Sequence, residues 1–126
     1  MRESLVKKSR KTVVLGLLLM ITVAGQAMAA ASLVSTTPEA SGTVTERPSQ
    51  IDLQFSETLR RIDIAVSGPK GRRVTTTVEL NQNDKSQVFA SFWDRLAPGR
   101  YSVRWTAVSL GKQRSHGSYS FTVKPS

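Results

Sequence analysis

The sequence contains no cysteine and only one histidine, His116. Without thiols the chain forms no disulfide, zinc–thiolate site or catalytic thiol, and attaches no haem through cysteine. All three methionines, Met1, Met20 and Met28, lie in the first 28 residues. A serine nucleophile needs an oriented base, and His116 is the only imidazole that could supply one. These absences remove most of the common catalytic and metal-binding chemistries.

Motifs for nucleotide binding and acid–base hydrolysis are also missing. The glycines belong to turns, and none forms a G-x-G-x-x-G or P-loop ahead of a helix. Asp52 and Asp63 alternate with apolar neighbours, which places both on outward positions of strands rather than in a shared cleft. The residues therefore predict that the protein is not an enzyme.

A long apolar run occurs only near the N-terminus. Val13–Val23 follows a basic segment, Met1–Thr12, and Ala27-Met28-Ala29 supplies the small residues of a cleavage site. This pattern predicts a secretory signal peptide over residues 1–29 and an exported domain over residues 30–126. The apolar core is shorter than the roughly 20 residues of a membrane span, so no transmembrane segment is expected after cleavage. The alternative is that the leader stays in place as an N-terminal anchor.

Basic residues outnumber acidic ones, 18 to 9, for a net charge of +9. Five of the basic residues and one acid fall in the leader, which leaves 13 and 8 in the exported part. The remaining cations are scattered over strands and turns, without the aromatic interleaving of nucleic-acid binders. They favour contact with an acidic partner or an anionic membrane surface, or serve solubility alone. Nucleic acid is not an expected partner.

Apolar and polar residues alternate with a period of two through most of the exported part, which is typical of strands buried on one face. Seven strands are expected, at Ser32–Thr36, Ile51–Phe55, Ile62–Val66, Val74–Leu80, Val88–Phe92, Tyr101–Ala107 and Tyr119–Val123. They lie about ten residues apart with turn signals between them, and no amphipathic helix occurs outside the leader. The spacing predicts an all-β fold, a Greek-key, immunoglobulin-like β-sandwich.

The segment Leu96-Ala97-Pro98-Gly99-Arg100-Tyr101 has the form of a tyrosine corner. In that device a tyrosine at the start of a strand turns its hydroxyl back to the preceding corner of a sandwich. Tyr101 and Trp105 are therefore expected in the corner and the core rather than in a ligand cage.

Several short motifs occur in a characteristic order along the exported part. They are Ser32–Pro38 followed by Gly42, then Leu53-Gln54-Phe55-Ser56-Glu57, then Leu96-x-Pro-Gly-x-Tyr-x-Val-x-Trp, then Val108-Ser109, then Gly117-x-Tyr-x-Phe-x-Val123. In this combination the chain resembles the CopC copper-resistance family. The resemblance implies a seven-stranded periplasmic sandwich related to copper binding, copper homeostasis and resistance, with a membrane copper-transport or other envelope protein as its partner.

The chain departs from the family pattern at the copper ligands that the resemblance implies. The mature N-terminal histidine of the family is replaced by Ala30, and the family's V-S-x-D-G-H loop has Gly111 and Gln113 in place of the aspartate and the second histidine. The Met-rich Cu(I) site of some members has no counterpart. Lys112 and Arg114 add positive charge beside this loop, which would repel a cation. Copper is thus the cofactor implied by resemblance, with most of its ligands missing.

Three positions keep a donor atom that copper could use: the freed amine of Ala30, the carboxylate of Glu57 and the imidazole of His116. Glu57 could equally pair with Arg60 or Arg61. Alternation places His116 with Ser118 on the solvent face of the last strand. One imidazole and one carboxylate would leave most of the coordination sphere to water.

Three hypotheses follow. The first is a periplasmic CopC-like protein with a degenerate metal site that acts by docking on a partner. The second is a working copper carrier that uses Ala30, Glu57 and His116. The third is a metal-free structural or adhesion module that uses exposed strand edges or arginine-rich turns for protein contact.

Overall fold

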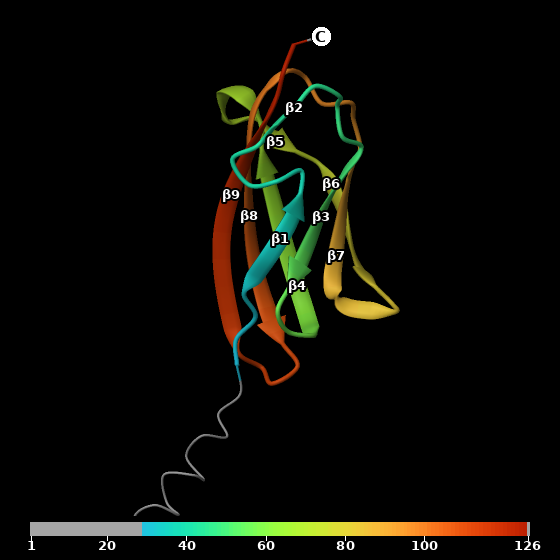
Figure 1. The fold of residues 1–126 in the computed structure, drawn as a ribbon, viewed down its shortest axis with the longest axis vertical. Coiled ribbons are helices and arrows are strands. Elements are labelled where there is room, and N and C mark those ends of the chain that lie inside the picture. Colours follow the sequence, from blue (N-terminus) through green and yellow to red (C-terminus); the bar gives the residue numbers. More distant parts are fainter. Residues whose placement is uncertain (1–28, 126) are drawn as a thin grey trace, which may run out of the picture.

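A computed structural model describes residues 29–125, which form two facing β-sheets (Figure 1). The elements are β1 (Leu33–Thr37), β2 (Thr43–Val44), β3 (Gln50–Phe55), β4 (Leu59–Ser67), the 3₁₀ helix η1 (Pro69–Gly71), β5 (Arg73–Val74), β6 (Thr76–Asn81), β7 (Asp84–Phe92), β8 (Gly99–Ser109) and β9 (Arg114–Val123). One sheet has the order β1-β3-β7-β6 and the other β2-β9-β8-β4-β5. The predicted all-β, immunoglobulin-like sandwich is confirmed.

The core lies between the sheets and takes alternate residues from the long strands. In β8, Tyr101, Val103, Trp105 and Ala107 are buried, whereas the residues between them are exposed. The other buried apolar residues are Ala31, Ile51, Leu53, Phe55, Leu59, Val66, Val88, Ala90, Leu96, Phe121 and Val123. Burial along these strands therefore repeats at every second residue, as the alternation in the sequence predicted.

The expected fourth strand, Val74–Leu80, is divided between the two sheets. Val74 belongs to β5 and pairs with Val66 of β4, whereas β6 begins at Thr76 and pairs with β7. The chain crosses from one sheet to the other at Thr75. Because inward residues of either sheet face the same core, alternation continues through the crossing and does not reveal it.

The start of β4 contains a β-bulge that alternation alone does not predict. Leu59 pairs with Ser109 and Arg61 pairs with Val108, so Arg60 is an extra residue without a partner on β8. A bulge lets two successive side chains point to the same side of a sheet. Arg60 and Arg61 are accordingly both exposed.

The predicted tyrosine corner is confirmed. The Tyr101 hydroxyl donates a hydrogen bond of 2.6 Å to the carbonyl oxygen of Ala97, and its ring stacks on Phe121 with centroids 5.4 Å apart. The hydrogen bond ties the turn before β8 to the first residues of that strand. A tyrosine hydroxyl is protonated at neutral pH and can donate, and burial raises the pKa of the Tyr101 phenol further.

Replacing Tyr101 by Phe should lower the free energy of unfolding by about 1–2 kcal/mol, because a hydrogen bond is lost and the Ala97 carbonyl is left without it. Urea denaturation followed by far-UV circular dichroism measures the loss. Tyr119→Phe is the matched control, because the Tyr119 hydroxyl is buried and has no hydrogen-bond partner among the described residues. Equal effects of the two substitutions would contradict a specific role for the corner.

The predicted leader falls almost wholly outside the described residues, which begin at Ala29. Cleavage after Ala29 and retention as an anchor therefore both stay predictions. Within residues 29–125, no helix has the length and apolar character needed to cross a membrane.

Candidate functional site

The N-terminal segment is held at one end of the sandwich. The Ser32 amide donates to the Ser56 hydroxyl, and the Ser56 amide donates to the Ser32 carbonyl, both at 2.9 Å. Ala31 is buried in the core. These contacts place the N-terminal segment beside the turn between β3 and β4, which carries Glu57. We call this end, formed by residues 29–32, 56–58 and 109–113, the N-terminal pole; the C-terminus lies at the opposite end (Figure 1).

The loop between β8 and β9 completes the N-terminal pole. The backbones of Ser109 and Gln113 are joined at 3.0 Å, and the Gln113 amide also donates to the Ser109 hydroxyl at 3.2 Å. The Leu110 amide donates to the Thr58 carbonyl at 3.1 Å, which fastens the loop to the β3–β4 turn. Lys112 adopts a left-handed backbone conformation, with φ of 66°. The loop is thus a defined turn whose shape depends on main-chain hydrogen bonds.

A cavity of about 180 Å³ lies between these segments. It is lined by Ala29, Glu57, Thr58, Ser109, Leu110 and Gly111. The cavity therefore lies between the N-terminal segment, the F-S-E segment and the loop after the tryptophan strand. Glu57 supplies its one carboxylate, and the Ser109 hydroxyl already accepts a hydrogen bond from Gln113.

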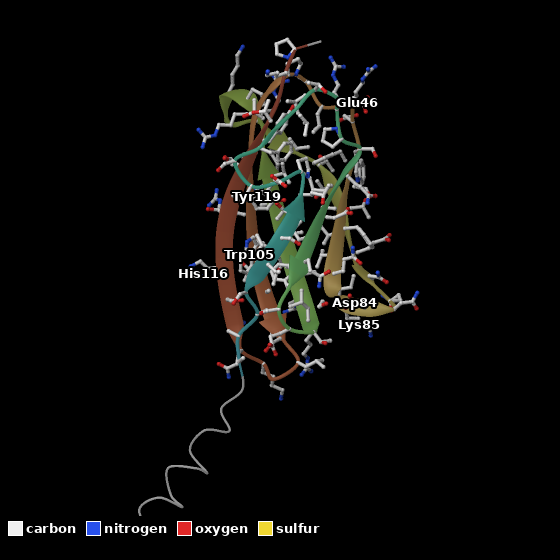
Figure 2. All side chains as sticks on the ribbon, in the orientation of Figure 1. Glu46, Asp84, Lys85, Trp105, His116 and Tyr119 are labelled. Carbon is white, nitrogen blue, oxygen red and sulfur yellow. The ribbon has the colours of Figure 1, made fainter. Side chains whose placement is uncertain are left out.

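His116 does not line this cavity. It lies on β9 opposite Thr106 of β8, and both residues are exposed, as is Ser118 (Figure 2). Thr106 is three residues from Ser109 along the strand, or about 10 Å. Ser109 also faces the interior, whereas His116 faces solvent. The structure thus places Ala30 and Glu57 at the same pole and separates His116 from them.

The donor set at the N-terminal pole does not fit copper. Among residues 29–125 there is no group of three His, Cys, Asp or Glu side chains that could hold a metal ion. The cavity offers one carboxylate and no imidazole, whereas Cu(II) favours several nitrogen ligands in a tetragonal array. Lys112 and Arg114, at the loop's far end, are both exposed cations.

Sequence reasoning missed a cluster of buried polar groups on the inner face of the β8–β9 pair. Trp105 Nε1, Ser115 Oγ and Tyr119 Oη are buried and have no hydrogen-bond partner among the described residues. Trp105 lies opposite Gly117, and Ser115 and Tyr119 flank that glycine on β9 (Figure 2). Alternation predicts that these positions face inward, but it carries no information on whether a polar atom finds a partner.

Burial, with the negative charge of Asp52, raises the pKa of Tyr119 well above its ordinary value. The unfolded chain ionises this phenol near pH 10, while the folded chain keeps it protonated. The contribution of the protonated Tyr119 phenol to the free energy of unfolding is therefore fully present below about pH 10, and it declines as the pH rises above that value. Tyr119→Phe should flatten that decline and leave stability at pH 7 unchanged or higher, by up to about 1 kcal/mol. Urea denaturation at several pH values tests this; parallel declines in both proteins would contradict it.

The chain is similar in sequence to a protein family and to several known proteins. Residues 33–124 match the family model described as the CopC domain. The chain is 34% identical over 90 residues to Protein YobA of Escherichia coli K12, covering 69% of this chain and 73% of that protein. It is 35% identical over 116 residues to Copper resistance protein C of Escherichia coli, covering 84% of this chain and 90% of that protein.

The fold also matches that of a solved copper-resistance protein. The crystal structure of PcoC, a methionine-rich copper resistance protein from Escherichia coli, superposes with a TM-score of 0.66 at 30% identity and covers 76% of this chain and all of that chain. The family model spans most of the part of the chain that the structure describes. The chain therefore belongs to the CopC family, and its relatives connect it to copper resistance.

Proposed function

We propose that this protein is a periplasmic member of the CopC family that contributes to copper homeostasis without holding copper tightly itself. It acts by docking on an envelope partner, such as a membrane copper-transport protein, and catalyses no reaction. The observation that supports the proposal is the cavity at the N-terminal pole, which has a single carboxylate, Glu57, among its lining residues in the described part of the chain.

The tip of the β8–β9 loop offers a contact for such a partner. Leu110 is 62% exposed and lies next to the cavity. Its main chain is fastened to Thr58, so the side chain projects from a fixed turn. Burial of this side chain in an apolar pocket of a partner removes apolar surface from water, which favours association. Docking at this pole would bring the partner to the position where metal would pass in a copper-binding relative.

Deletion of the gene and complementation with variants test the proposal. Copper tolerance of the host should fall on deletion and return with the natural protein and with the double variant Glu57→Gln, His116→Ala. Leu110→Asp should fail to restore it, whereas Val34→Asp, at an equally exposed apolar residue on β1, should succeed. Comparable amounts of each protein in the envelope must be verified by immunoblot.

The outcomes separate the three hypotheses. If Glu57→Gln, His116→Ala fails to restore tolerance while Leu110→Asp succeeds, the protein is a copper carrier with an unusual site. If deletion leaves copper tolerance unchanged, the structural or adhesion module gains support and the copper-related docking role is wrong.

A further inference from the structure

Four basic side chains surround one hollow on the outer face of the five-stranded sheet, close to the N-terminal pole. The hollow has a volume of about 410 Å³ and is lined by Arg60, Arg61, Val108, Lys112 and Arg114. Within residues 29–125, no acidic side chain contributes to its lining. We call it the four-cation hollow. Its lining shares no residue with the cavity at the N-terminal pole.

Strand register sets the spacing of two of these cations. Val108 of β8 pairs with Arg61 of β4 on one side and with Arg114 of β9 on the other. Neighbouring strands lie about 4.8 Å apart, so the two arginine Cα atoms are roughly 10 Å from each other. Val108, half-buried, forms the floor between them. An oxoanion above Val108 can accept hydrogen bonds from both guanidinium groups, whose paired donors match phosphate and carboxylate oxygens.

Two local irregularities add the other cations. The bulge at the start of β4 turns Arg60 to the same side as Arg61, which regular alternation would prevent. The left-handed conformation of Lys112 reverses the β8–β9 loop just before Arg114. With these two irregularities, Arg60 and Lys112 line the same hollow as Arg61 and Arg114.

The concentration of charge favours an anion. Like charges held together repel each other, and an anion of several charges removes that repulsion when it binds. The opposite end of the molecule has a second basic hollow, lined in part by Lys70, Arg72, Arg73 and Arg95, but Asp94 contributes a carboxylate to it. Of these two hollows, only the four-cation hollow has no carboxylate among its lining residues within residues 29–125.

We propose that the four-cation hollow binds the phosphate group of an oxoanion, either free in solution or carried by a lipid headgroup. Among the residues that the structure describes, its lining has no aromatic side chain and only Val108 as an apolar residue, which does not suit the apolar core of a peptide or protein interface. Four cations in one hollow match a compact group with two or more negative charges. The site is independent of copper.

Isothermal titration of the copper-free exported protein with inorganic pyrophosphate at low ionic strength tests the site. The natural protein should bind saturably at one site, and binding should weaken as sodium chloride is added. Arg61→Gln, Arg114→Gln should weaken binding at least about tenfold, since it removes two charge-assisted interactions. The matched control, Arg72→Gln, Arg73→Gln, changes charge equally at exposed residues outside the hollow and should shift affinity by less than about twofold.

A single exposed substitution, Lys112→Gln, provides a second test should the double variant fold poorly; it should also weaken binding. Absence of saturable binding by the natural protein would overturn the proposal. Equal losses in the hollow and control variants would do the same, because they indicate unspecific attraction. So would equally tight binding of an oligoglutamate peptide of the same charge, because the hollow would then not select phosphate.

Sedimentation with lipid vesicles distinguishes the two sources of phosphate. The lipid probe is phosphatidic acid, whose phosphomonoester headgroup carries close to two negative charges at neutral pH. Sedimentation with phosphatidic acid vesicles but not with phosphatidylcholine vesicles, lost in Arg61→Gln, Arg114→Gln, supports a lipid headgroup. Pyrophosphate binding without sedimentation supports a free phosphate compound. Sedimentation that the double variant retains would show that membrane contact does not use this hollow, and would overturn the lipid source.

Discussion

The triple variant Ala30→His, Gly111→Asp, Gln113→His should bind Cu(II) on the order of 1,000-fold more tightly than the natural chain, if each restored ligand contributes about 1.4 kcal/mol. These substitutions supply the imidazoles and the carboxylate that the family pattern has at these positions. Cu(II) favours such nitrogen-rich sets. Competition against a chromophoric chelator measures the gain.

The structure gives reasons why the pole should accept these ligands. Gly111 lines the same cavity as Glu57, so a new donor at position 111 lies close to that carboxylate. Position 30 belongs to the N-terminal segment, which hydrogen bonds between Ser32 and Ser56 hold beside the turn that carries Glu57. Gly111 is not among the described residues with positive φ, and a side chain there meets no backbone strain. Gln113 is exposed, with its backbone bonded to Ser109.

The matched control for the triple variant is Ala30→Gln, Gly111→Asn, which adds side chains without imidazole or carboxylate and should leave Cu(II) affinity near that of the natural protein. The triple variant must carry its histidine directly after the cleavage site, because the amine and the imidazole chelate together. If the triple variant gains no Cu(II) affinity, the N-terminal pole differs from a copper site in more than its ligands. The missing ligands alone would then not explain weak copper binding by the natural chain.

Gly117→Ala should lower the free energy of unfolding by about 1–3 kcal/mol, which is the usual cost of overpacking a core. A Cβ at Gly117 would lie 2.6 Å from Cζ2 and 2.9 Å from Cε2 of Trp105. The indole is 7% exposed and packs edge-on against Phe55, with ring centroids 5.0 Å apart, so it has little room to move. Thermal and urea denaturation measure the loss.

The neighbouring exposed residue offers the control: Ser118→Ala should change stability by less than about 0.5 kcal/mol. In the Gly117→Ala background, Trp105→Phe should cost less than it does alone, because the smaller ring leaves space for the new methyl group. Additive effects in this double-mutant cycle would show that the contact between Gly117 and Trp105 is not what the glycine preserves.

Alternation and turn chemistry predicted most of the fold, because both are local properties of the chain. The buried face of β8 and the corner at Tyr101 were read directly from the order of residues. The crossing at Thr75 and the bulge at Arg60 were not, because each depends on which strand pairs with which. Pairing between distant segments leaves little trace in a single sequence.

The candidate site was predictable in its parts but not in its arrangement. Glu57 and Ala30 could be named from the family pattern, and the structure places both at the N-terminal pole, whereas His116 lies apart from them. The left-handed backbone at Lys112 and the partnerless Trp105 Nε1 carry no local signal, since both depend on the folded environment. The four-cation hollow likewise needs three strands and a loop to meet before its charges become neighbours.

A Cu(II) titration of the exported protein with its natural N-terminus tests most directly whether the protein has the CopC fold without a tight copper site. A weak competing chelator is present, and visible absorption and electron paramagnetic resonance report where the copper resides. We expect copper to stay with the chelator and the resonance spectrum to be that of the chelator complex. Transfer of one equivalent of copper to the protein, with nitrogen hyperfine structure, would contradict it.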